Sequence, residues 1–168
     1  MTENSETAKK IKILIVDDEV DFLQSIAKRL EIRDFDITTA TNGEEALKAT
    51  KSRKFDLALL DLKMPGMDGT EVLAKLKKRH KWLEVIILTG HGSVDSAVEC
   101  TKLGAFGYLA KPYDLEKLLE VLKQAYEARL KKKFEHDKKR SDELAILSMG
   151  ESPMGILRAL LRIDDDDK

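Results

Sequence analysis

Ile-Leu-Ile-Val-Asp-Asp-Glu, residues 13–19, decides the fold predicted for this chain. The apolar run at residues 11–16 is interrupted only by Lys12, which is typical of an interior parallel strand covered on both faces. Two carboxylates, Asp17 and Asp18, follow at once. In an open parallel sheet, residues just past the carboxyl ends of the strands share one crevice. The stretch therefore predicts a buried strand that ends at an acidic site.

The alternation of strand and helix continues along the chain. Four more short apolar runs are typical of strands, at residues 35–40, 55–60, 85–88 and 106–109. Apolar residues at helical spacing predict helices at residues 21–32, about 44–51, around 72–76, 94–103 and from 115 onward. This pattern predicts an α/β fold with a doubly wound, five-stranded parallel sheet. Because crossovers are right-handed, few topologies remain, and we favour the flavodoxin-like order 2-1-3-4-5.

Residues with reactive or charged side chains follow four of the five predicted strands. Asp17 and Asp18 follow the first strand, Asp61 the third, Thr89 the fourth and Lys111 the fifth. In the favoured order the switch point lies between strands 1 and 3, where ligands of such sheets bind. We therefore expect three carboxylates, one hydroxyl and one ammonium to converge on a site for a divalent cation and a phosphoryl group.

Four segments carry a resemblance to a known family. They are Ile-Leu-Ile-Val-Asp-Asp-Glu (13–19), Asp-Leu-Lys-Met-Pro-Gly-Met-Asp-Gly (61–69), Leu-Thr-Gly (88–90) and Tyr-Leu-Ala-Lys-Pro (108–112). In this order they closely resemble the receiver domain of two-component response regulators, over residues 10–128. The Thr-Gly-His-Gly loop at residues 89–92 and the helix after it are most similar to receivers of the nitrogen-regulation class of sigma-54-dependent activators.

The resemblance implies a phosphoryl-acceptor site. Asp61 is then the nucleophile that takes a phosphoryl group from a sensor histidine kinase or phosphotransfer protein, as carboxylates can. The implied cation is Mg²⁺, with Mn²⁺ as an alternative, and it suits a set of oxygen ligands. By resemblance, Asp18 and Asp61 bind it through side chains, Asp17 through water and Lys63 through its backbone carbonyl. No enzymatic activity is expected beyond phosphotransfer to Asp61 and autodephosphorylation.

The resemblance also implies a switch. Lys111 supplies a positive charge to the phosphoryl group, and its bond to Pro112 is expected to be cis. Thr89 gains a partner in the phosphoryl group, and Tyr108 then rotates inward. The face made by helix 4, strand 5 and helix 5 changes as a result.

Two further side chains are expected to tune the acyl phosphate lifetime. Lys63 and His91 stand two residues after Asp61 and Thr89, and by resemblance they line the attack path of water. Simpler interpretations remain open at two positions: Tyr108 as core filler and His91 as an exposed loop histidine.

Composition bounds the protein's environment. The net charge is -1, which gives no bulk attraction to nucleic acid or membrane. The one cysteine, Cys100, excludes an internal disulfide and fits a reducing compartment. The polar N-terminus lacks the apolar core of a secretory signal, and no apolar run approaches the roughly 20 residues of a membrane span. The sequence therefore predicts a cytoplasmic protein without a membrane partner.

The predicted organisation has three parts. Residues 1–9 are expected to be a disordered leader, residues 10–128 the receiver domain, and residues 129–168 a helical tail, partly flexible. Within the tail, residues 141–149 have a second short helical pattern, residues 152–153 break it, and residues 154–163 are amphipathic. Residues 164–168 match an engineered protease site and are assigned no function.

The tail also bears on the partners. Residues 129–140 contain seven basic and two acidic residues, but no helix-turn-helix is recognisable, so a solvated helix face is favoured over direct DNA binding. Output is expected through protein contacts or a homodimer formed by helix 4, strand 5 and helix 5 or by the tail.

Two other functions remain as alternatives. One is a receiver-like module used only for structure or dimerisation, against which the complete set of Asp17, Asp18, Asp61, Thr89 and Lys111 argues. The other is an aspartate-nucleophile phosphatase of the haloacid dehalogenase type. That class places an Asp-x-Asp motif at strand 1, whereas this chain has Asp-Asp-Glu there and lacks a substrate cap.

Overall fold

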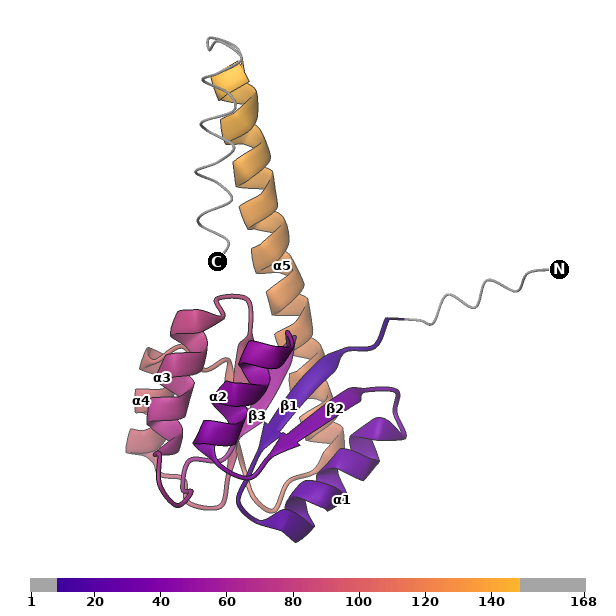
Figure 1. The fold of residues 1–168 in the computed structure, drawn as a ribbon, viewed down its shortest axis with the longest axis vertical. Helices are drawn as coiled ribbons and strands as arrows, with labels where there is room; N and C mark the ends of the chain where they lie inside the picture. The colour runs from indigo at the N-terminus through magenta and orange to yellow at the C-terminus, as the bar shows by residue number, and fades with distance from the viewer. Residues whose placement is uncertain (1–8, 149–168) are drawn as a thin grey trace, which may run out of the picture. The chain divides into compact units, whose positions relative to one another are not determined.

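The computed structural model describes residues 9–148, in which strands and helices alternate along the chain. The elements are β1 (Lys12–Val16), α1 (Val20–Glu31), β2 (Asp36–Ala40), α2 (Gly43–Ser52), β3 (Leu57–Leu60), α3 (Gly69–Arg79), β4 (Glu84–Thr89), α4 (Val94–Lys102), β5 (Gly107–Ala110) and α5 (Leu115–Ser148). The five strands pair in parallel in the order β2-β1-β3-β4-β5 (Figure 1). The predicted α/β fold and strand order are confirmed.

Strand β1 shows how the sequence produces two cores. Successive side chains of a strand point to opposite faces of the sheet. Leu14 and Val16 pack in the core formed with α2, α3 and α4, whereas Ile13 and Ile15 pack in the core formed with α1 and α5. All four side chains are at most 1% exposed. The continuous apolar run is thus the consequence of a strand buried on both faces.

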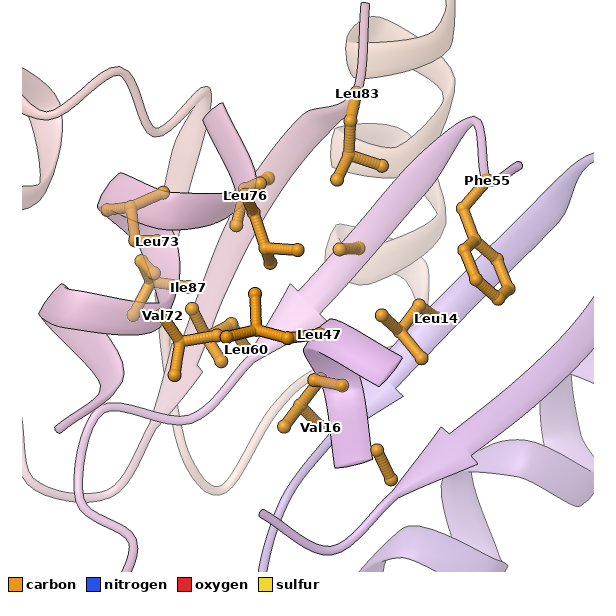
Figure 2. Close-up of a cluster of buried hydrophobic side chains, with 14 of the residues drawn as sticks. Leu14, Val16, Leu47, Phe55, Leu60, Val72, Leu73, Leu76, Leu83 and Ile87 are labelled. Atoms are coloured by element: carbon orange, nitrogen blue, oxygen red, sulfur yellow. The ribbon is translucent and has the colours of Figure 1, made fainter. Parts of the chain in front are cut away.

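Helix α3 anchors the middle of the sheet on one face. Figure 2 shows Val72, Leu73 and Leu76 of this helix facing the side chains of Leu60 and Ile87 from the neighbouring strands. Each such buried side chain contributes about 1.5–3 kcal/mol relative to an exposed one. This packing fixes the carboxyl ends of β3 and β4, where the reactive residues lie.

Polar side chains begin four of the helices. Asn42 Oδ1 accepts from the Glu45 N–H (2.9 Å), and Asp68 Oδ1 accepts from the Thr70 N–H (3.2 Å). At the start of α4, Ser93 forms a reciprocal capping box, and at the start of α5, Asp114 Oδ1 accepts from the Glu116 N–H at 2.9 Å. These bonds satisfy helix N–H groups that have no partner within the helix.

Asp56, just before β3, connects the start of β1 with α5. Its Oδ2 accepts a hydrogen bond from the Lys12 N–H (2.9 Å), and its Oδ1 lies 3.2 Å from the Arg129 guanidinium. One carboxylate therefore joins the start of β1 to α5 at the edge of the sheet opposite the reactive residues.

Strand β4 begins one residue earlier than predicted. Glu84 pairs with Leu57 in the parallel register and is only 1% exposed. A charged residue ordinarily indicates the end of a buried strand. Here the Lys77 ammonium lies 4.0 Å from the Glu84 carboxylate and lets the strand include it.

Residues 141–148 are helical, as their pattern predicts, but they do not form a second helix, because α5 continues without a break to Ser148. Its apolar spacing changes along the way, but strong helix formers such as Lys, Glu, Leu and Ala maintain the helix. Residues Met1–Arg129 form one compact unit and Leu130–Lys168 a second. The expected leader, except Lys9, and the expected features at residues 149–168 lie outside the described residues. None of the helices within residues 9–148 is both long and apolar enough to cross a membrane.

Candidate functional site

The reactive side chains are placed by backbone hydrogen bonds that extend the sheet past its strands. The Asp17 N–H donates to the Ala40 carbonyl (3.1 Å), and the Asp61 N–H donates to the Val16 carbonyl (3.0 Å). The Lys111 N–H donates in the same way to the carbonyl of Thr89 (2.9 Å). The side chains therefore stand at the carboxyl edge of the sheet, around the switch point between β1 and β3.

Three carboxylates, here called the acid trio, come together at this edge. One oxygen from each of Asp17, Asp18 and Asp61 lies within 4.8 Å of the others. Asp17 is 1% and Asp61 2% exposed, whereas Asp18 is exposed. The Oδ1 atom of Asp61 is buried and has no hydrogen-bond partner. Native proteins rarely leave a buried carboxylate oxygen unpaired, so this atom is available to a ligand.

Burial dominates the electrostatics of Asp17. Desolvation raises the pKa of its carboxyl above the usual range, because burial disfavours the charged form. A hydrogen bond from the Lys111 ammonium and one from the Glu19 N–H (2.9 Å) act in the opposite direction. The negative charge of Asp61 adds to the rise. Positive charge close to Asp17 therefore favours the ionised form of its carboxyl.

The Lys111 ammonium supplies part of that charge. Its Nζ lies 2.5 Å from Asp17 Oδ2, 3.8 Å from Glu19 Oε1 and 4.0 Å from Asp61 Oδ2. It also stands 4.1 Å from the centre of the Phe22 ring, a cation–π contact that holds the side chain over α1. The Lys111–Pro112 peptide bond is cis, which confirms that expectation.

Thr89 lies at the end of β4 and is 1% exposed. Its hydroxyl oxygen accepts a hydrogen bond from the His91 N–H at 3.1 Å. The side chains of His91 and Lys63 are exposed on the loops that follow β4 and β3.

Tyr108 of β5 is half-buried and packs against the core formed with α2, α3 and α4. Its hydroxyl lies 3.1 Å from Ser96 Oγ in the first turn of α4. The sequence reasoning did not identify Ser96, because a serine three residues after a helix cap has no pattern that distinguishes it from an ordinary capping residue.

Gly69 is a second residue that the sequence reasoning missed. A Cβ at this position would lie 2.5 Å from the Asp61 carbonyl oxygen and 2.5 Å from Leu62 Cα. The Gly69 N–H also donates to the Leu62 carbonyl at 2.9 Å. The start of α3 thus presses against the backbone that carries Asp61. The only signal in the sequence is a glycine directly after the Asp68 cap.

The donor set of the acid trio fits a hard divalent cation. Magnesium prefers oxygen ligands and binds through one or two carboxylates while keeping several waters. Two buried carboxylates and one exposed carboxylate provide such ligands, and one of the buried carboxylates, Asp61, has an unpaired oxygen. The clustering of Asp17, Asp18 and Asp61 is therefore chemically suited to the predicted Mg²⁺.

Comparison with known proteins agrees with this geometry. The family model for the response regulator receiver domain matches residues 13–123, which is more than half of the chain. The response regulator receiver domain protein (CheY-like) from Methanospirillum hungatei JF-1 has a crystal structure that superposes with a TM-score of 0.71 at 34% identity, covering 74% of this chain and 99% of that one.

Curated relatives include response regulators of the NtrC and NtrX type, as expected from the loop at residues 89–92. The DNA-binding transcriptional regulator NtrC of Escherichia coli K12 is 38% identical over 113 residues, covering 67% of this chain and 24% of that protein. A putative response regulator NtrX-like protein of Rickettsia bellii is 40% identical over 119 residues, covering 70% of this chain and 25% of the relative. The chain thus spans about a quarter of the length of the curated relatives it matches.

Proposed function

This chain belongs to the response regulator receiver domain family, and we propose that it is a signalling switch controlled by phosphorylation of Asp61. A sensor histidine kinase or phosphotransfer protein is the proposed donor. The observation that carries the proposal is the buried Oδ1 of Asp61, which lacks a partner although the other two carboxylates of the acid trio and the Lys111 ammonium stand around it. An unpaired nucleophile in such surroundings is suited to accept a phosphoryl group.

The proposed step is a transfer between a phosphohistidine and a carboxylate. An Asp61 oxygen attacks phosphorus, a new O–P bond forms, and the P–N bond of the donor breaks with its electron pair left on the imidazole. Lys111, which is 4.0 Å from Asp61 Oδ2, contributes positive charge toward the arriving phosphoryl oxygens.

Asp17, Asp18, Asp61 and the backbone carbonyl of Lys63 are the proposed Mg²⁺ ligands, with Mn²⁺ as an alternative ion. When bound, the cation supplies neutralising charge between carboxylate and phosphoryl oxygens. The residues themselves position the nucleophile: Asp61 is fixed by its N–H bond to Val16 and by the contact with Gly69.

The proposed response begins at Thr89. A phosphoryl group on Asp61 offers the Thr89 hydroxyl a charged acceptor. Movement of Thr89 toward it changes the space available to Tyr108 and alters the surface of α4, β5 and α5. The exposed side chains of Lys63 and His91 are the proposed determinants of the lifetime, through the approach of water to the acyl phosphate.

The proposed output is protein association through that surface. Two apolar side chains on α4 are exposed, Val94 at 80% and Val98 at 48%. Exposed apolar side chains grouped on one helix favour a protein partner, and a second copy of this chain is the proposed one. The printed name of NtrC refers to DNA binding, whereas for this chain the absence of direct DNA binding stays a prediction.

The test is phosphoryl labelling with acetyl phosphate and Mg²⁺, read by intact-protein mass. The parent should gain one phosphoryl group, Asp61→Asn none, and removal of Mg²⁺ with a chelator should stop the labelling. The matched control is Asp34→Asn at the turn after α1, where φ is 64° and Asn is readily accommodated. Equal labelling of the parent and of Asp61→Asn would contradict the assignment.

The same experiment separates the alternatives. A well-folded parent that takes no phosphoryl group from acetyl phosphate or from any kinase would favour the module used only for structure or dimerisation. Continuous hydrolysis of unrelated phosphate esters by the purified protein would favour the phosphatase.

A further inference from the structure

The hydroxyl of Tyr108 lies in a small seat between the loop after β4 and the first turn of α4. Ser96 Oγ is 3.1 Å from this hydroxyl. On the other side, Gly92 approaches the ring so closely that a Cβ at position 92 would overlap the hydroxyl and lie 2.9 Å from Cζ. The ring can take this position only because residue 92 has no side chain.

Ser96 Oγ is the centre of several hydrogen bonds at the start of α4. It donates to the Ser93 carbonyl at 2.9 Å and accepts from the Ser93 N–H at 2.9 Å and from the Ser93 hydroxyl at 3.1 Å. The Tyr108 hydroxyl joins this group through its hydrogen bond with Ser96 Oγ, in which either oxygen can be the donor. Since Ser93 caps α4, the Tyr108 ring is joined to the amino end of this helix.

Thr89 has a defined partner in the same arrangement. Its hydroxyl oxygen accepts from the His91 N–H, one residue before Gly92. The loop at residues 89–92 thus holds Thr89 at one end and leaves space for Tyr108 at the other. A change at Thr89 and a change at Tyr108 both act on this loop.

We propose that Gly92 and Ser96 form a seat for the Tyr108 hydroxyl and that this seat sets how strongly the unphosphorylated switch resists activation. The inference rests on the proposed function, in which phosphorylation of Asp61 changes the space available to Tyr108, and it adds that the ring then leaves the position beside Gly92 and Ser96. A phosphoryl group then works against the Tyr108–Ser96 bond. Any change that weakens the seat raises the population of the competent arrangement and tightens binding of a phosphoryl analogue by the same factor.

The expected size of the effect follows from one neutral hydrogen bond. Such a bond contributes modestly in net terms, which corresponds to a change of roughly two- to tenfold in the balance of the two ring positions. Ser96→Ala should shift the balance by that factor, and Ser96→Thr, which keeps the hydroxyl, should restore it. Ser25→Ala, an exposed serine on α1 at the opposite face of the sheet, is the matched control.

The first readout is the ring itself. The chain has three tyrosines, so a protein with ¹³Cε-labelled tyrosine gives a simple NMR spectrum in which Tyr108→Phe assigns the signal of interest. Ser96→Ala should move the Tyr108 signal of the free protein toward its position in the beryllofluoride complex. Ser96→Thr and Ser25→Ala should leave it in place.

The second readout is the dissociation constant of beryllofluoride in the presence of Mg²⁺. It should fall by roughly two- to tenfold in Ser96→Ala. Tyr108→Phe should lower it similarly, and the double variant should gain nothing further, because both changes remove one bond.

Gly92→Ala tests the seat without removing either hydroxyl. Its φ lies outside the left-handed region, so the backbone accepts alanine, and the added methyl group displaces the ring. This variant should move the Tyr108 signal in the same direction as Ser96→Ala. A Tyr108 signal and a beryllofluoride affinity unchanged in both variants would overturn the inference.

The two proposals fail separately. A parent protein that does not bind beryllofluoride contradicts the proposed function, while the Tyr108 signals of free Ser96→Ala and Gly92→Ala still show whether the seat holds the ring. A parent that binds beryllofluoride, with an affinity and a Tyr108 signal that both stay the same in Ser96→Ala and in Gly92→Ala, overturns the seat alone.

Discussion

The Lys111 ammonium is bound to Asp17 and not to the proposed phosphoryl acceptor. Its Nζ lies 2.5 Å from Asp17 Oδ2 but 4.0 Å from Asp61 Oδ2. Burial raises the pKa of Asp17, and Lys111 counteracts this rise. The Lys111 ammonium therefore neutralises part of the negative charge of the acid trio, which a bound metal cation would also do. In the proposed function, an arriving phosphoryl group has to draw Lys111 away from Asp17.

Lys111→Met should tighten the binding of Mg²⁺ while slowing phosphoryl transfer. Methionine keeps an apolar stem beside Phe22 but removes a positive charge next to the acid trio. A unit charge about 4 Å away is worth roughly 1 kcal/mol even in bulk water, so the affinity should rise at least about fivefold. Calorimetric titration with Mg²⁺ checks this, with the exposed Lys28→Met on α1 as control. Weaker binding in Lys111→Met would show that the lysine supports the cation site.

Gly69→Ala should destabilise the fold and impair labelling of Asp61. The new Cβ would lie 2.5 Å from the Asp61 carbonyl oxygen, and backbone atoms cannot move aside as a flexible side chain can. Overpacking of this kind costs about 1–3 kcal/mol in the free energy of unfolding. Urea unfolding measures the cost.

Gly90→Ala is the natural comparison for that variant. The nearest atom to a Cβ at residue 90 is 3.8 Å away, an ordinary contact. Its free energy of unfolding should match that of the parent. Equal stability of Gly69→Ala and the parent would mean that α3 does not hold the acceptor backbone in place.

His80 should make the stability depend on pH in mildly acidic solution. Desolvation lowers its pKa below the ordinary 6.5, and the charge of Arg79 adds to the effect. The unfolded chain then binds more protons than the folded one between the lowered pKa and 6.5. The free energy of unfolding therefore rises with pH through this window. The contribution of the neutral His80 is lost as pH falls through it. His80→Gln should flatten that part of the curve, and identical slopes in both proteins would contradict the cause assigned here.

Truncation after Arg129 should leave phosphoryl labelling intact. Residues Met1–Arg129 form one compact unit, and Arg129 pairs with Asp56 inside it. In the truncated chain, Arg129→Gln should lower the free energy of unfolding by about 1–3 kcal/mol, since it leaves the largely buried Asp56 carboxylate without its charged partner. Thermal unfolding and intact-protein mass check both points. A truncated chain that folds but takes no label would assign residues beyond 129 to the site.

The apolar run at residues 13–16 was sufficient to predict a strand buried on both faces. Three strand ends were equally sufficient to predict that the acid trio and Lys111 come together, because parallel strands bring their carboxyl ends to one edge. The subgroup also followed from a local loop, Thr-Gly-His-Gly, since its residues are adjacent in sequence.

Specific side-chain contacts between residues far apart in the sequence could not be predicted. Nothing in the pattern around Asp56 indicates Arg129, and nothing around Gly92 indicates Tyr108, because each pair is brought together only by the packing of complete elements. The strand predicted at residues 85–88 did not include Glu84, whose charge, taken without Lys77, is unusual in a buried strand. Residues 141–148 were assigned to a second helix rather than to α5, because apolar spacing was weighted above helix propensity.

The most direct test of the central claim locates the phosphoryl group. The parent protein is labelled with acetyl phosphate and Mg²⁺, treated with borohydride to convert the acyl phosphate to homoserine, and digested for peptide mass spectrometry. The account predicts homoserine at position 61 and an unmodified aspartate at positions 17, 18 and 34. Homoserine at position 17 or 18, or labelled protein with aspartate intact at position 61, would contradict it.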